Sequence, residues 1–322
     1  MYKAFYGLTR NPFEISPDPY FLFATARHNE ALASIVHGVF RHKGFIVVTG
    51  EVGTGKTLLV RCLLEILRRR EIASANVFNP CLSPVEFLRY IVGDLGIKTA
   101  NHDKGSLLLE LNNYLIERHR KHTTTVLIVD EAQHLEPDLL EEIRLLTNLE
   151  TSQQKLLQIV LVGQPELDLK MDSGDLRQLK QRIALRCQLE PLQEEEIKSY
   201  ILRRLQRAGA NSHANTMFSG ETIASVYRYS RGIPRLINTI CENALIASYA
   251  VKAQSVLPEV IEEVAKDLRL SVISRPAMVT PAVSFEQRDI AKSLLRLVEA
   301  LERVARHSSA RETSSDSGVK IV

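Results

Sequence analysis

The chain has 322 residues, of which 45% are hydrophobic and 25% charged, and its formal net charge is +3. These values describe an ordinary globular protein long enough for two domains, and so mild a charge does not by itself indicate nucleic acid or an anionic membrane as a partner. The four cysteines are scattered without a C-x-x-C pair, so neither a disulfide framework nor a metal site is expected, and a reducing cytoplasm fits best.

Residues 1–43 begin with a segment rich in proline and aromatic side chains, called here the lead-in, and the sequence predicts a helix near 28–42 after it. The first residues lack the apolar core of a signal peptide, and no apolar run approaches the ~18 residues of a membrane span. We therefore expect no transmembrane segment, and any association with a membrane would come through a partner.

The next segment fits the phosphate-binding pattern G-x-x-x-x-G-K-[ST] without a mismatch. An apolar, β-branched run over 45–49 precedes it and leucines at helical spacing follow it, which predicts a strand, a glycine-rich loop and a helix. Backbone N–H groups of such a loop converge on phosphate oxygens, while its lysine meets the β- and γ-phosphates and its threonine joins the Mg²⁺ shell. The loop residues are Gly50, Glu51, Val52, Gly53, Thr54, Gly55, Lys56 and Thr57. The sequence therefore predicts a site for ATP and Mg²⁺.

Strands alternate with helices over 44–191, which predicts an α/β domain: a P-loop core with a parallel sheet and helices on both faces. The expected strands are 45–49, 75–78, 125–130, 157–162 and 185–189, and the expected helices are 56–70, 84–95, 105–121, 137–149 and 175–183. Residues 192–270 predict a small all-α lid with helices at 193–208, 219–230, 234–251 and 258–268.

Residues 271–322 predict a linker, a short amphipathic helix from about 285 to 306 and a serine-rich disordered tail. The helix carries a heptad seam of about two heptads, formed by Ile290, Leu294, Leu297, Leu301 and Val304. Such a seam can dock on the protein's own core or pair with a second chain, and both interpretations stay open.

Two carboxylates, Asp130 and Glu131, come directly after the apolar run 126–129. Asp130 suits Mg²⁺ beside Thr57, and Glu131 suits a general base for the water that attacks the γ-phosphate. Because the chain turns at the end of a strand, both side chains can reach one cleft.

Hydrolysis of a nucleotide also needs positive charge near the transferred phosphoryl group. Arg182 lies just before the last expected strand, and Arg235 follows Gly232-Ile233-Pro234 at the start of a lid helix. An arginine is ordinarily a surface residue, but the order of these two relative to the phosphate motifs favours a role for both.

In this order the motifs resemble those of an AAA+ ATPase. More narrowly, the chain resembles the ExeA/GspA family of secretion-associated ATPases from residue 1 to about 270. The strings that carry the resemblance are 13–23, 130–133, 144–150, 155–158, 162–167 and 232–238.

The resemblance implies a role for each matching position. Gln164 would be the first sensor, Arg182 a finger that reaches the neighbouring subunit's nucleotide, and Arg235 the second sensor, while Gln133 would position water or relay the phosphate state. The lead-in and residues 233–234 would face the adenine. A finger acting in trans requires a head-to-tail homo-oligomer, either a ring or a filament.

The sequence departs from the family in two places. His134 stands where many relatives carry Asn. The family's namesake continues through a membrane helix into a peptidoglycan-binding region, whereas this sequence ends in a short polar tail, so direct cell-wall binding is not expected.

We expect a cytoplasmic, Mg²⁺-dependent ATPase that acts as a switch or assembly motor for an envelope secretion or exopolysaccharide export system, through a protein partner at the inner membrane. The alternative, a DNA-binding AAA+ ATPase of the transposition-targeting type, stays open. Basic runs at 68–70 and 118–122 could serve DNA, but cations at expected helix ends also offset the helix dipole, and no aromatic residues interleave with them. A scaffold that barely hydrolyses ATP would have no need of Glu131.

Overall fold

A five-stranded parallel sheet forms the centre of the core domain, in the order β2-β3-β4-β1-β5. The computed structural model describes residues 2–270, apart from Pro17, Leu22, Ala24, Asn79, 173–175 and 211–212. The strands are β1 (Phe45–Gly50), β2 (Ala73–Val77), β3 (Thr125–Val129), β4 (Leu157–Gly163) and β5 (Leu185–Leu189). The expected C-terminal helix, its heptad seam and the serine-rich tail lie outside the described residues.

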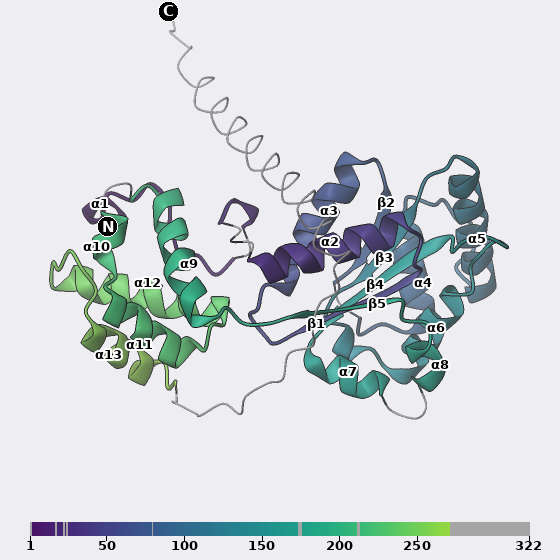
Figure 1. Ribbon diagram of the computed structural model, residues 1–322. Coiled ribbons are helices and arrows are strands. Elements are labelled where there is room, and N and C mark those ends of the chain that lie inside the picture. The colour runs from purple at the N-terminus through teal and green to yellow at the C-terminus, as the bar shows by residue number, and fades with distance from the viewer. Residues whose placement is uncertain are drawn as a thin grey trace, which may run out of the picture.

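Both faces of the sheet are covered by helices, which explains why its strands are apolar without alternation. In β1, Phe45 and Val47 pack into one core, and Ile46 and Val48 pack into the other. The second of these cores lies under α2 (Ala26–Phe40) and α3 (Lys56–Arg69) (Figure 1). Helices on the opposite face are α4 (Pro84–Asp94), α5 (Lys104–Arg120), α6 (Pro137–Leu146), α7 (Pro165–Met171) and α8 (Arg177–Lys180). The predicted α/β architecture is confirmed.

Local signals set several of these helix boundaries. Thr25 caps α2 by accepting a hydrogen bond from His28 N, and Ser83 with Glu86 forms a reciprocal capping box at the start of α4. Helix α7 was not expected from the sequence, although Pro165 occupies its first turn, where proline is well tolerated. Helix α6 ends at Leu146, three residues before the predicted end.

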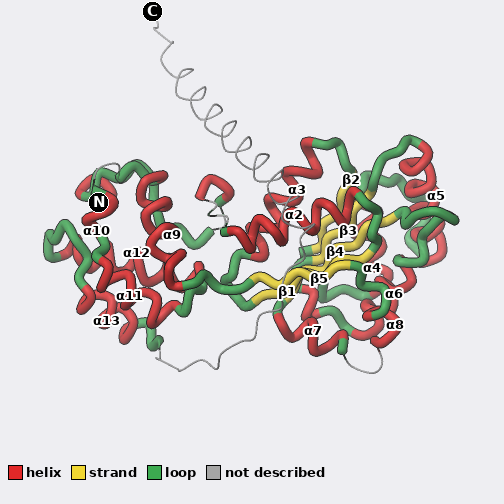
Figure 2. The backbone as a smooth tube through the Cα atoms, in the orientation of Figure 1, coloured by secondary structure: helices red, strands yellow, loops and turns green. Residues whose placement is uncertain are grey.

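The lid consists of α9 (Glu194–Arg207), α10 (Ala214–Met217), α11 (Gly220–Ser230), α12 (Pro234–Ala250) and α13 (Pro258–Asp267). It stands beside the core as a separate group of helices, with the sheet confined to the core (Figure 2). Helix α10 was not expected from the sequence. Among all the described residues, no helix is both long and apolar enough to cross a bilayer.

The lead-in packs into the lid although the whole core separates the two in sequence. It contains α1 (Tyr2–Phe5) and a short 3₁₀ turn (Pro19–Phe21), and its Phe13 and Phe21 are buried in the lid's hydrophobic cluster. Arg204 of α9, only 7% exposed, donates from Nε to Pro12 O at 2.6 Å and from Nη2 to Glu14 O at 3.4 Å. The N-terminus accordingly lies on the lid (Figure 1).

Candidate nucleotide-binding site

The P-loop connects β1 to α3, as the sequence predicts. Gly53 and Gly55 take left-handed conformations, with φ of 83° and 104°, and Lys56 begins the helix. The Lys56 ammonium is buried in the loop and donates to Gly50 O at 2.8 Å and Glu51 O at 3.0 Å. Burial lowers the pKa of Lys56, while the carboxylates of Glu131 and Asp130 oppose that shift.

The acidic pair lies where β3 ends, next to the P-loop. Asp130 is buried, and its side chain is hydrogen-bonded to that of Thr57; burial raises the pKa of the Asp130 carboxyl. Glu131 has a left-handed backbone, with φ of 53°, and its N–H donates to Asp130 Oδ1 at 2.9 Å. This turn places the two carboxylates at one strand end.

Two glutamines hold the Glu131 side chain. Gln133 Nε2 donates to Glu131 Oε2 at 2.6 Å, and Gln164 Nε2 donates to the same oxygen at 3.4 Å. The glutamines are themselves linked, because Gln164 N donates to Gln133 Oε1 at 3.0 Å. Gln133 follows β3 and Gln164 follows the neighbouring strand β4. The structure thus brings both side chains into contact with Glu131, the candidate general base.

The lid meets the P-loop through the turn that begins α12. Arg235 N donates to Gly53 O at 3.2 Å, and a Cβ on Gly53 would lie 2.7 Å from Arg235 Cβ. Gly232, with φ of 76°, approaches the chain segment that joins β5 to α9 so closely that a Cβ there would lie 1.9 Å from Leu192 O. Only glycine permits this contact, which fixes the lid turn against both the connecting segment and the loop.

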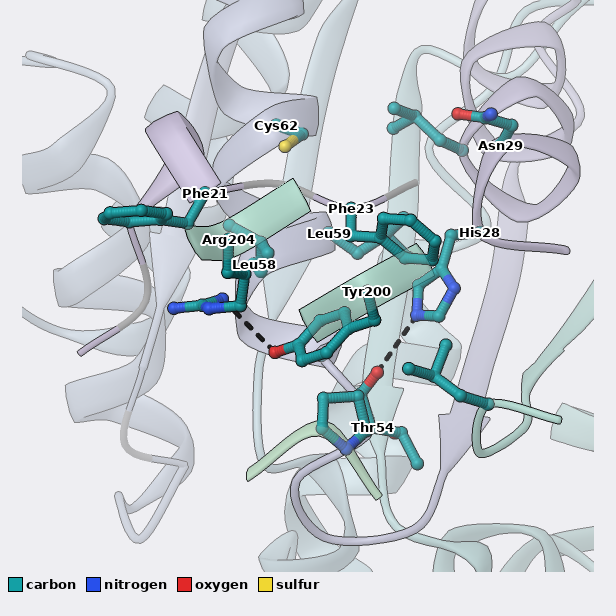
Figure 3. Close-up of a pocket in the computed structure, with 14 residues that line it drawn as sticks. Phe21, Phe23, His28, Asn29, Thr54, Leu58, Leu59, Cys62, Tyr200 and Arg204 are labelled. Atoms are coloured by element: carbon teal, nitrogen blue, oxygen red, sulfur yellow. Dashed lines mark hydrogen bonds between the residues drawn. The ribbon is translucent and has the colours of Figure 1, made fainter. Parts of the chain in front are cut away.

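A pocket of about 560 Å³, including its open side, adjoins the P-loop residues Thr54 and Gly55. Figure 3 shows that three parts of the chain line it together. They are the lead-in (Phe21, Phe23), the core (His28, Asn29, Leu32, Leu58, Leu59, Cys62) and the lid (Leu192, Tyr200, Arg204, Pro234). Aromatic and aliphatic walls beside a phosphate loop suit a purine ring. The lead-in and Pro234 line this pocket, and Ile233 lies close to Gly53; that these residues face the adenine stays a prediction.

His28 ties the start of α2 to the P-loop. Its Nε2 lies 3.0 Å from Thr54 O, and its Nδ1 lies 2.8 Å from Thr25 Oγ1. Because a carbonyl oxygen only accepts, Nε2 carries a hydrogen, and burial lowers the pKa of His28, which favours the neutral ring.

Sequence reasoning missed His28, Tyr200 and Arg204. Arg204 had a signal: it lies on the apolar face of α9, one turn after Tyr200, where an arginine is unexpected. Its guanidinium carbon lies 4.8 Å from the centroid of the Phe21 ring. No pattern in the sequence singled out His28.

Arg182 lies apart from the residues described so far. Its guanidinium donates to Thr147 Oγ1 and, at 2.5 Å, to Asn148 Oδ1 at the end of α6. A role toward a neighbouring subunit stays a prediction. His134 is exposed in the turn after Glu131.

The oxygen atoms of Thr57 and Asp130 are of the type that Mg²⁺ prefers as ligands. The Thr57 hydroxyl and the Asp130 carboxylate are hard oxygen ligands and already contact each other. Within the described residues no group of three His, Cys, Asp or Glu side chains could form a metal cage by itself. One or two protein oxygens completed by phosphate and water are the usual surroundings of Mg²⁺.

Comparison with known proteins agrees with this geometry. Residues 39–171 match the family model described as an AAA domain. General secretion pathway protein A of Aeromonas hydrophila is 44% identical over 251 residues, which cover 78% of this chain and 45% of that protein. ATP-dependent target DNA activator B of Escherichia phage Mu is 29% identical over 158 residues, or 48% of this chain and 46% of that protein. The chain thus spans less than half the length of these relatives.

Two solved structures share the fold. The ORC2 protein of Aeropyrum pernix has a TM-score of 0.58 at 16% identity, covering 80% of this chain and 71% of its own. Cdc6p of Pyrobaculum aerophilum has a TM-score of 0.59 at 18% identity, covering 82% and 70%. From its P-loop, acidic strand end and helical lid, and from its identity to the Aeromonas protein, the chain belongs to the GspA (ExeA) family of AAA+ ATPases.

Proposed function

We propose that this protein hydrolyses ATP to ADP and phosphate with Mg²⁺. The observation that carries the proposal is the placement of Glu131, which two glutamine amides hold beside the hydrogen-bonded pair Thr57 and Asp130. A carboxylate held in this way can accept a proton from water. A site built only to bind nucleotide needs no such group.

Each residue has a separate task in this proposal. The loop N–H groups and Lys56 bind the phosphates, and Thr57 and Asp130 would hold Mg²⁺, which neutralises charge on the phosphate oxygens. Glu131 takes the proton of the attacking water. Arg235, at the junction of lid and P-loop, adds positive charge and links lid position to the phosphate state.

The decisive experiment compares Glu131→Gln with Glu136→Gln. Both changes remove one carboxylate, but Glu136 is exposed and its side chain makes no cap contact. We expect Glu131→Gln to bind ATP normally and to release phosphate about 10²–10⁴-fold more slowly, as for loss of a general base, while Glu136→Gln stays near wild type. Normal phosphate release by Glu131→Gln would place the base elsewhere.

The cellular role that we propose is that of a switch or assembly motor for envelope secretion or export, acting through a protein at the inner membrane. The support is the 44% identity to general secretion pathway protein A. In this role ATP would favour one packing of subunits, with Arg182 reaching the neighbour's nucleotide, and hydrolysis would release it. Sedimentation of Glu131→Gln with ATP and with ADP tests this: a larger species should form only with ATP.

A second candidate function is DNA targeting, because the phage Mu activator matches about half of this chain. Under that function, duplex DNA would raise ATP turnover, and its affinity would fall steeply with salt. Turnover that does not respond to DNA would remove this candidate.

A further inference from the structure

Three turns, each of which joins a helix to the amino end of a strand, contain one residue with a left-handed backbone. Helices α2, α3 and α5 run into β1, β2 and β3 through residues with left-handed backbone, His42 (φ 52°), Glu71 (φ 56°) and His122 (φ 54°). Each helix ends in cations. They are Arg41 and Lys43 beside α2, residues 68–70 at the end of α3, and Arg118, Arg120 and Lys121 at the end of α5.

Contacts between the turns join these cations into one surface, called here the basic edge. The Arg70 guanidinium carbon lies 5.7 Å from the centroid of the Phe40 ring at the end of α2. Arg118 Nη2 donates to Glu71 O at 3.4 Å, which connects α5 to the turn after α3. The two basic runs, treated separately in the sequence, are therefore neighbours in the fold.

The charge of the basic edge exceeds what the helix ends require. A helix C-terminus is equivalent to about half a negative charge, and one cation offsets it. Beside α5, Lys121 pairs with Glu117 at 2.6 Å, whereas Arg120 acts on the Glu117 carboxylate only at longer range and forms no salt bridge with any described carboxylate. Arg41 and Lys43 beside α2, both exposed, likewise have none within the part of the chain that the structure describes.

The basic edge lies opposite the nucleotide site. Gly50, Asp130 and Gln164 stand at the carboxyl ends of β1, β3 and β4, whereas the basic edge stands at the amino ends of the same parallel sheet. A partner bound there would leave the P-loop and the lid open to nucleotide.

We propose that the basic edge binds an anionic membrane surface through lipid phosphate groups. Glu65, Glu71 and Glu117 stand among the cations. Mobile lipids can arrange themselves around these carboxylates, but a DNA duplex presents phosphates at a fixed spacing of about 1.7 Å per charge along its axis. Phe40 is 40% exposed and adds an aromatic ring of the kind that enters a membrane interface.

The test compares two triple variants of equal charge. The basic-edge variant is Arg41→Gln, Lys43→Gln and Arg120→Gln, and the control is Arg89→Gln, Lys198→Gln and Lys266→Gln, which changes exposed residues on α4, α9 and α13. Binding of the full chain to phosphatidylglycerol–phosphatidylcholine vesicles and to pure phosphatidylcholine vesicles is measured by co-sedimentation. Each basic side chain near an anionic surface is worth roughly fivefold in affinity, so with partial screening we expect at least a tenfold loss for the basic-edge variant alone.

Binding to phosphatidylglycerol vesicles that falls as salt rises, with the loss confined to the basic-edge variant, supports the proposal. An equal loss in the control, no binding by wild type, or wild-type binding that is indifferent to salt would overturn it. So would binding to a DNA duplex that is tighter than binding to vesicles and is lost in the basic-edge variant, because that result assigns the surface to nucleic acid. The inference does not depend on ATP hydrolysis, and both variants should keep wild-type phosphate release and unfolding midpoints.

Discussion

Replacing Gly232 by alanine tests whether the lid turn is fixed by close contact with the segment at Leu192. The left-handed backbone costs about 1–2 kcal/mol for a residue with a Cβ. The new Cβ would also lie 1.9 Å from Leu192 O, far inside ordinary contact, and such overpacking costs about 1–3 kcal/mol. We therefore expect a loss of about 2–5 kcal/mol in unfolding free energy. Because Leu192 lines the pocket, the KM for ATP should also rise.

Two other glycines, one in the lead-in and one in the lid, separate the cost of the left-handed backbone from the cost of the close contact. Gly7 has φ of 66° but nothing within 4 Å of an added Cβ, so Gly7→Ala should cost only the backbone part. Gly220, in α11, has neither feature, and Gly220→Ala should leave stability unchanged or slightly higher. Urea unfolding followed by circular dichroism measures all three, with phosphate release in parallel. If Gly232→Ala lost no more than Gly7→Ala, the close contact would have no energetic importance and the reasoning would fail.

Further changes address the site and the lid. Gln133→Ala should lower kcat about tenfold with little change in KM, because one charged hydrogen bond to Glu131 is lost; an unchanged kcat in steady-state assays would show that Gln133 does not position the base. Arg182→Ala should cut turnover by about 10³-fold if the arginine acts in trans, whereas Thr147→Val, which removes one of its hydrogen-bond partners within the chain, should not; equal losses would indicate a structural role. Arg204→Met should lose about 1.5–3 kcal/mol of stability and speed amide exchange in the lead-in; unchanged exchange there would show that the hydrogen bonds from Arg204 to Pro12 and Glu14 do not hold the lead-in on the lid.

The sequence predicted the sheet well because its strands are locally encoded. Apolar, β-branched runs such as 45–49 and 125–129 can form little else when helices of regular period separate them. The start of β2 was placed two residues late, since Ala73 and Ser74 have no strand preference of their own and are held by pairing with Thr125 and Val126. Helices α7 and α10, of seven and four residues, are too short for a period to show.

The residues of the candidate site likewise fall into those that a local motif predicts and those that only tertiary packing brings there. Lys56, Asp130 and Glu131 lie in contiguous motifs, and the fold brings them together because the carboxyl ends of parallel strands meet at one edge. The packing of the lead-in against α9, which supplies part of the pocket wall, could not be predicted from local spacing, since it depends on the hydrogen bond between Arg204 and Pro12, which are 192 positions apart. Such pairings follow from tertiary packing and leave no local pattern.

The union of the lead-in with the lid has a consequence for biosynthesis. Phe13 and Phe21 leave the ribosome about 180 residues before other members of their buried cluster, such as Tyr200 and Ile201. At 5–20 residues per second, roughly 10–35 s pass while these aromatic side chains have no native surface to cover them. The core can fold meanwhile, so we expect the lead-in to depend on a chaperone to cover its aromatic side chains until the lid helices arrive.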